Sequence, residues 1–387
     1  MTLASSDTLQ ARLTRVRDVL RNAGLDALVV THLPNLFYLT NFNGTSAIGV
    51  VTPDAVGFIT DFRYLSAVSA LQDGASACPG LELWPVEQSY EEALAKRVGA
   101  LASGRVGFEA AHLTVSRLRW LETGVRDAGP MELVPTEGVV ESARVRKDAG
   151  EQATLREAAR RLSAVLEGVL ADVRVGITET EVALALESGM RRTGFSRPAF
   201  DTIVASGPGS ALPHARAGER RLARGDLVVL DFGGVYNGYC VDLTRTVSMG
   251  PPSPEAARLY AAVRRAHAAA VAAVAPGAAT HDVDGAARGS LMADGYGDAF
   301  GHGTGHGLGL EVHEAPRIAK KDSGAADRVH PPGHLPDPTA LAPGMVVTIE
   351  PGAYLPGFGG ARIEDDVLVT PEGCEVLTTV GRDLRVC

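Results

Sequence analysis

The chain has 387 residues, 45% of them hydrophobic and 44 of them glycine, so it can bury a substantial core and is long enough for two domains. Its formal net charge of −9 comes from 37 basic and 46 acidic residues, and no run of Lys or Arg is suited to follow a phosphate backbone. We therefore expect an ordinary globular protein that does not bind nucleic acid.

The first residues, MTLASSDTLQARLTRVRDVL, lack the apolar segment of a secretory signal, and no later stretch reaches the ~18 apolar residues of a membrane span. This pattern predicts a cytoplasmic protein without a membrane partner. The absence of a CxxC pair argues against a disulfide framework or a thiolate zinc site. The cysteines are Cys78, Cys240, Cys374 and Cys387.

The N-terminal part alternates helix and strand patterns and predicts an α/β domain over residues 1–140. Helices are expected before Gly24 and over 63–71 and 90–101. Strands are expected at 27–30, 48–51, 56–60 and 106–108. No part of this half places ligand-type residues together.

The sequence turns polar at 145–150, and we place the boundary just before this segment, so that the second domain comprises 141–387. Apolar residues at helical spacing then predict a long amphipathic helix over 155–169. A second helix is expected to begin at the capping box formed by Thr178 and Glu181.

An internal repeat relates GDLVVLDFG to GMVVTIEPG, and each strand-like apolar run ends in a carboxylate, Asp231 or Glu350. Each carboxylate is followed by a second acid, Asp242 or Glu364. An acid that closes a buried strand is poorly explained by solvation alone. Two related hairpins, each offering a pair of carboxylates, are the simplest structural interpretation.

The turn of the first hairpin is predicted at Asn237-Gly238, a strong signal for a two-residue connection. In that register Asp231 lies opposite Thr244, and the two-residue period of a strand puts Asp231 and Asp242 on one face as diagonal neighbours. Their carboxylates can then converge on one ion.

The second hairpin is expected to repeat this arrangement with Glu350 and Glu364, while PGAYLPGFGG returns the chain antiparallel. Pro351 cannot donate to a ladder, so the strand should end just after Glu350. The segment GHGTGHGLG is too rich in glycine for a comfortable helix, and it lacks the glutamate of HExxH. We expect it to bring its backbone close to a ligand while presenting His306.

Four carboxylates and one neutral histidine bring about four negative charges, which would offset two divalent cations. Oxygen-rich ligation favours Mn²⁺, with Co²⁺ or Zn²⁺ as alternatives. Two such ions can activate a water and polarise the carbonyl that it attacks. The sequence therefore predicts a two-metal hydrolase. A serine hydrolase and a nucleotide enzyme are disfavoured, because no G-x-S-x-G, Walker or G-x-G-x-x-G motif is present.

The motifs DFGGVYNGYCVDLTRT, GHGTGHGLGLEVHE, MVVTIEPG and ARIEDD resemble, in this order, the pita-bread metallopeptidases, and more narrowly their prolidase and aminopeptidase P branch. The leading DALVVTHLPNLFYLTNF resembles the creatinase-type N-terminal domain of the same branch. The resemblance spans nearly the whole chain. It implies an α/β (α+β) protein in which a creatinase-like N-terminal domain precedes a pita-bread catalytic domain, and it implies a homodimer.

The resemblance also implies a set of metal ligands, with Glu350 acting in addition as the general base. The ligands are Asp231, Asp242, His306, Glu350 and Glu364.

Further residues receive roles from the same resemblance. His214 lines the pocket and assists substrate binding or proton transfer, and His302 is a second histidine of the pocket. His313 steadies the tetrahedral intermediate, and Arg362 supports the ligands. Arg317 falls where prolidases place an arginine that grips a substrate carboxylate, a task that suits a planar guanidinium.

The resemblance implies hydrolysis of the peptide bond that precedes proline in a small peptide, with an Xaa-Pro dipeptidase preferred because of Arg317. An aminopeptidase P that acts on Xaa-Pro-Yaa peptides is the first alternative. A hydrolase or lyase of a non-peptide small molecule on the same fold is the second. The proline-rich segment between His313 and Glu350 carries His330 and His334, which we interpret as parts of an exposed flap rather than as ligands.

Overall fold

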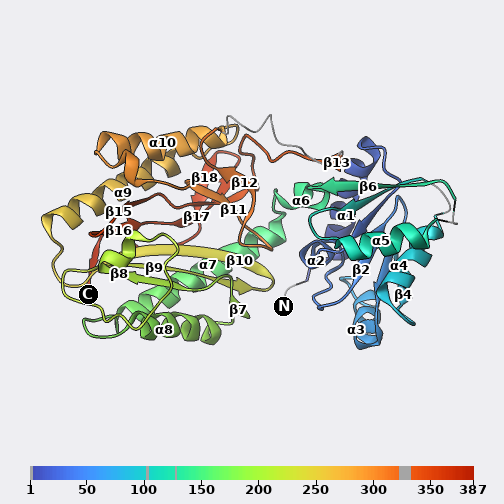
Figure 1. The fold of residues 1–387 in the computed structure, drawn as a ribbon, viewed down its shortest axis with the longest axis horizontal. Helices are drawn as coiled ribbons and strands as arrows, with labels where there is room; N and C mark the ends of the chain where they lie inside the picture. Colours follow the sequence, from blue (N-terminus) through green and yellow to red (C-terminus); the bar gives the residue numbers. More distant parts are fainter. Residues whose placement is uncertain (1–2, 102–103, 127–128, 322–332) are drawn as a thin grey trace. The chain divides into compact units, whose positions relative to one another are not determined.

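The structure is a computed structural model that describes residues 3–101, 104–126, 129–321 and 333–387 (Figure 1). The chain divides into two compact units, the first comprising Met1–Arg144 and Gly324–Pro336 and the second comprising Val145–Ser323 and Asp337–Cys387. No helix in the described part of the chain is both long and apolar enough to cross a membrane.

The first unit is a mixed sheet with helices and confirms the expected α/β domain. Its strand order is β13-β6-β5-β1-β2-β3-β4. The strands are β1 (Ala27–Val30), β2 (Ile48–Val51), β3 (Val56–Thr60), β4 (Leu81–Pro85), β5 (Gly104–Glu109), β6 (Met131–Glu137) and β13 (Gly333–His334). The helices are α1 (Ser6–Asn22), α2 (Leu33–Thr40), α3 (Phe62–Gln72), α4 (Tyr90–Gly99), α5 (Val115–Gly124) and α6 (Val139–Arg144).

The second histidine of the expected flap belongs to this sheet. His334 lies in β13, which pairs in parallel with β6, and its Nδ1 atom lies 3.2 Å from Oε2 of Glu137. This residue is therefore held in a ladder and is not part of an exposed flap. His330 lies outside the described residues.

The second unit places its strands between two pairs of helices, α7 with α8 and α9 with α10 (Figure 1). Helix α7 packs on β9 and β10, while α9 packs on β14, β15 and β16. The helices are α7 (Ala149–Leu170), α8 (Glu179–Arg192), α9 (Pro254–Ala273) and α10 (Thr280–Ala293). The strands are β7 (Arg197–Pro198), β8 (Ile203–Ser206), β9 (Leu227–Tyr236), β10 (Tyr239–Ser248), β11 (Gly305–Gly307), β12 (Glu314–Ile318), β14 (Val346–Ile349), β15 (Gly352–Leu355), β16 (Gly359–Arg362), β17 (Asp365–Thr370), β18 (Gly373–Val376) and β19 (Arg385–Val386). Two short 3₁₀ helices lie at Gly207–Ala211 and Gly297–Ala299.

Local signals in the sequence explain where the helices of this unit begin. The Thr178 side chain accepts from the backbone of Glu181, whose carboxylate accepts in return from the backbone of Thr178, so the predicted capping box is confirmed. Asp148 and Glu151 form a second box at the start of α7. The predicted apolar face of α7 is buried against the sheet.

The first hairpin has the predicted register. Asp231 pairs with Thr244 and Asp242 pairs with Gly233, so the two aspartates are diagonal neighbours on one face of β9 and β10. The turn needs positive φ at both central residues, and Asn237 (φ 50°) and Gly238 (φ 91°) provide it.

The second hairpin differs from the expected repeat. Ile349 pairs with Asp365, and Gly352 pairs with Arg362, so the register continues through the break at Pro351. Glu350 follows Ile349 and Glu364 precedes Asp365, so this register places Glu350 directly opposite Glu364. In the first hairpin, Asp231 and Asp242 are instead diagonal neighbours. Because proline removes a ladder donor, β14 ends at Ile349 and the chain resumes as β15, as expected.

Candidate metal centre

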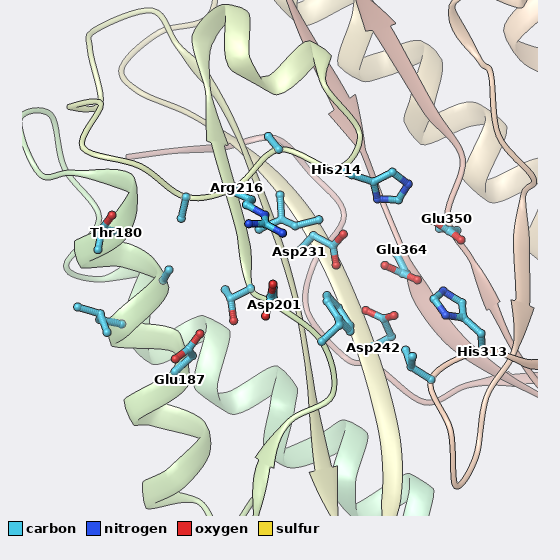
Figure 2. Close-up of a pocket in the computed structure, with 18 of the residues that line it drawn as sticks. Thr180, Glu187, Asp201, His214, Arg216, Asp231, Asp242, His313, Glu350 and Glu364 are labelled. Carbon is cyan, nitrogen blue, oxygen red and sulfur yellow. The ribbon is translucent and has the colours of Figure 1, made fainter. Parts of the chain in front are cut away.

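Five side chains from separate segments of the second unit meet at one cavity of about 610 Å³ (Figure 2). Asp231 comes from β9, Asp242 from β10 and His306 from β11, while Glu350 and Glu364 lie at the bend of the second hairpin. All five predicted ligand residues line this cavity.

Glycines bring His306 to the cavity. A Cβ atom at Gly305 would lie 1.9 Å from the Thr348 carbonyl oxygen, and one at Gly307 would lie 2.1 Å from that of Ala315. The strand β11 can therefore approach its neighbours only where side chains are absent, which is the close approach that the sequence predicted.

The imidazole of His306 has a defined orientation. Its Nδ1 lies 2.9 Å from the Gly307 carbonyl oxygen, so this nitrogen must donate, and the lone pair lies on Nε2. The Nε2 atom is 3.7 Å from Oε1 of Glu350. Burial lowers the pKa of His306 to about 4, so the ring is neutral at neutral pH and is suited to bind a cation.

The carboxylates are held by neighbours on β10 and β16. The Thr244 hydroxyl donates to Oε2 of Glu364 at 2.7 Å, and Nη1 of Arg245 donates to the Glu364 carbonyl oxygen at 2.6 Å. Arg362 is buried and donates to Oδ2 of Asp231. The contacts from Thr244 and Arg362 orient the carboxylates of Glu364 and Asp231 before any ion binds.

Negative charge accumulates at this site. Burial raises the pKa of Asp242 and Glu364, and neighbouring carboxylates raise both further. Burial raises the pKa of Glu350 to about 7, although the guanidinium of Arg362 acts in the opposite direction. Cations among these groups would reverse these shifts, because they favour the ionised carboxylates.

Two atoms test whether the site suits metal ions. Oδ1 of Asp231 and Oδ1 of Asp242 are buried and have no hydrogen-bond partner among the described residues. Ligand atoms of Asp242, His306 and Glu364 lie within 4.8 Å of one another. Buried carboxylate oxygens without partners are costly, and a cation is the partner that this set of oxygen and nitrogen atoms fits.

The remaining predicted residues divide into two groups. His214 and His313 line the cavity, and the His313 ring lies 4.4 Å from the His306 ring, centroid to centroid. Arg362, His302 and Arg317 are not among the described residues that line it. Arg317 is exposed on β12 and pairs with His306 across the ladder, so both side chains lie on the same face of the sheet.

Tyr354 connects two of these residues and was not foreseen from the sequence. Nη1 of Arg362 donates to its hydroxyl oxygen at 2.7 Å, and the hydroxyl lies 2.9 Å from Nε2 of His302. Because Nδ1 of His302 must donate to the Gly303 carbonyl oxygen, Nε2 accepts from Tyr354. The one signal in the sequence that could have indicated Tyr354 is its position four residues after Glu350.

A second group that sequence reasoning missed is His32, His112 and Glu141 in the first unit. The two imidazoles stack with centroids 3.7 Å apart and planes 6° apart. The lone pair of an imidazole nitrogen lies in the plane of its ring. Two parallel stacked rings therefore cannot both point a lone pair at the same ion unless one ring rotates. This group therefore lacks the convergence shown by the five cavity residues.

Comparisons with known proteins identify the family of each part of the chain. The model of metallopeptidase family M24 matches residues 153–371, and that of the creatinase/prolidase N-terminal domain matches residues 12–146. The chain is 38% identical to the uncharacterized peptidase YqhT of Bacillus subtilis, over 97% of this chain and 99% of that protein.

Two solved structures extend the likeness to the whole fold. An Xaa-Pro dipeptidase from Bacillus anthracis is 38% identical with a TM-score of 0.89, covering 98% of this chain and 100% of that one. An X-Pro aminopeptidase from Thermotoga maritima is 32% identical with a TM-score of 0.83, covering 96% and 100%. The chain therefore belongs to metallopeptidase family M24 and carries a creatinase/prolidase N-terminal domain.

Proposed function

We propose that the chain hydrolyses the peptide bond preceding proline in Xaa-Pro dipeptides, with two divalent ions held by the five cavity residues. The observation that carries this proposal is the set of four carboxylates that line one cavity together with His306, two of which have buried oxygens without partners among the described residues. Mn²⁺ is the favoured ion because the ligand atoms are mainly hard oxygens, with Co²⁺ and Zn²⁺ as alternatives.

When bound, the ions would supply Lewis acidity toward the scissile carbonyl and lower the pKa of the attacking water. Glu350 is the proposed general base, since its carboxylate lines the cavity beside the other ligands, where it can accept the proton of the attacking water. His313 has a pKa lowered by burial, so its neutral imidazole can donate one hydrogen bond to the developing oxyanion.

The network behind the ligands keeps these groups in place. Arg362 joins Asp231 to Tyr354, and Tyr354 joins Arg362 to His302. Burial lowers the pKa of His302 to about 4, so this ring stays neutral and accepts from Tyr354. The role of His302 in substrate binding stays a prediction, because both its ring nitrogens are engaged within the protein.

The length of peptide accepted depends on Arg317. In the dipeptidase assignment, its guanidinium pairs with the carboxylate of the substrate proline, which an Xaa-Pro-Yaa peptide does not present at that place. The name of the Bacillus anthracis protein supports the dipeptidase, while that of the Thermotoga maritima protein supports aminopeptidase P as the second candidate.

Hydrolysis of Ala-Pro, Met-Pro and Arg-Pro-Pro with Mn²⁺ tests the choice. We expect turnover of the dipeptides and loss of dipeptide selectivity in Arg317→Ala. Turnover of the tripeptide alone would establish the aminopeptidase. Full activity on a peptide after chelation would instead favour metal-independent chemistry. No activity on any peptide by the metal-loaded protein would favour the non-peptide alternative.

Two further expectations accompany this function. A homodimer and a cytoplasmic location stay predictions, the first from the family resemblance and the second from the sequence pattern. Light scattering of the purified chain tests the dimer directly, because a mass near 40.4 kDa would contradict it.

A further inference from the structure

The cavity with the candidate ligands continues to one face of helix α8 (Figure 2). Thr180, Ala183, Leu184 and Glu187 line it from α8, at the helical spacing that places residues on the same side. The segment 200–203 lines the cavity as well. This end of the cavity is therefore a partly solvent-exposed extension of the metal centre, and apolar and charged residues line it together.

The extension carries charges that the protein itself does not pair. Glu187, Asp201 and Arg216 line it, and none of them forms a side-chain hydrogen bond or ion pair with another described residue. Thr202 lines the same part, is 7% exposed, and has a buried hydroxyl oxygen without a hydrogen-bond partner among the described residues. Buried polar atoms are usually satisfied, so this one indicates a polar ligand group nearby.

The direction of the substrate follows from the proposed function, on which this inference rests. The carbonyl under attack belongs to Xaa, and the proline carboxylate is assigned to Arg317 on β12. Figure 2 shows His313, just before β12, beyond Asp242 and Glu364 as seen from α8. The Xaa side chain then extends from the metal centre toward α8.

We propose that this end of the cavity selects substrates whose N-terminal residue is basic, Lys or Arg. The aliphatic part of such a side chain would contact Leu184, Phe200 and Ile203, and its cationic head would lie near Glu187 and Asp201. Two carboxylates against one guanidinium leave an excess of negative charge, so Arg216 weakens the preference without cancelling it.

Matched substrates and variants test this preference. Lysyl-proline and norleucyl-proline have side-chain stems of the same length and differ by the ammonium group, while glutamyl-proline reverses the charge. We expect kcat/KM to be about three- to ten-fold higher for lysyl-proline than for norleucyl-proline, and lowest for glutamyl-proline, as solvated ion pairs allow. The ratio should fall as salt is raised.

The variants assign the effect to residues. In the double variant Glu187→Gln, Asp201→Asn the lysyl to norleucyl ratio should fall to about one, and in Arg216→Ala it should rise. Glu219→Gln removes one negative charge from an exposed residue outside the cavity lining, and its ratio should equal that of the parent protein.

The outcomes separate this inference from the proposed function. A parent ratio at or below one, or an unchanged ratio in the double variant, overturns the preference while leaving Xaa-Pro hydrolysis intact. Hydrolysis of none of the three dipeptides by metal-loaded protein overturns the proposed function and this inference together.

Discussion

The hydroxyl of Thr244 offers a direct test of how the protein orients a metal ligand. Thr244 is 0% exposed on β10, and its Oγ1 donates to Oε2 of Glu364 at 2.7 Å. Thr244→Val keeps the shape and removes this donor. A hydrogen bond to a charged group contributes about 1.5 to 3 kcal/mol, which corresponds to roughly a 10- to 100-fold loss of metal affinity if the bond preorganises Glu364.

The assay is calorimetric titration of metal-free protein with Mn²⁺, accompanied by thermal unfolding. Thr136→Val is the matched control, because Thr136 is 1% exposed and its hydroxyl donates to the Phe108 carbonyl oxygen at 2.9 Å in the first unit. We expect both variants to lose some stability and only Thr244→Val to lose Mn²⁺ affinity. Equal affinity in the two variants would refute the reasoning.

Three other outcomes follow from the site. Asp231→Asn should lose one of two bound ions and most of the turnover, as counted by elemental analysis; unchanged metal content would show that Asp231 is no ligand. Gly305→Ala should destabilise the protein by about 1 to 3 kcal/mol or more in denaturant unfolding, because its Cβ would meet the Thr348 carbonyl oxygen at 1.9 Å; wild-type stability would contradict the close approach. Metal-free protein should lose stability as pH rises from about 4.5 to about 7, since burial raises the pKa of Glu350 and the folded state then binds more protons than the unfolded state. Glu350 alone should lower the free energy of unfolding by roughly 2 to 3 kcal/mol over this pH range. The free energy of unfolding of metal-free Glu350→Gln should therefore depend less steeply on pH. Equal pH dependence in the variant and the parent protein would contradict the raised pKa.

The sequence predicted the first hairpin well because local signals determine it. Asn237-Gly238 specifies the turn, and the turn specifies the register that makes Asp231 and Asp242 diagonal neighbours. The second hairpin was less predictable, because Pro351 interrupts its first strand. The pairing on both sides of Pro351 nevertheless keeps one register, which places Glu350 directly opposite Glu364.

Contacts between distant segments were beyond sequence reasoning. Every residue of helix α2 from Asn35 to Thr40 is buried, so the helix shows no amphipathic period that would have predicted it. Tyr354 meets His302 only through the fold, and His334 joins the first sheet by pairing with β6 from the far end of the chain. No spacing or periodicity encodes such pairings.

Crystals of the Mn²⁺-loaded chain, measured for anomalous scattering, test the central claim most directly. The account predicts two peaks, both within bonding distance of carboxylate oxygens from Asp231, Asp242, Glu350 and Glu364, with Nε2 of His306 on one of them. A single peak, or peaks away from these side chains in a protein that still hydrolyses Xaa-Pro, would contradict it.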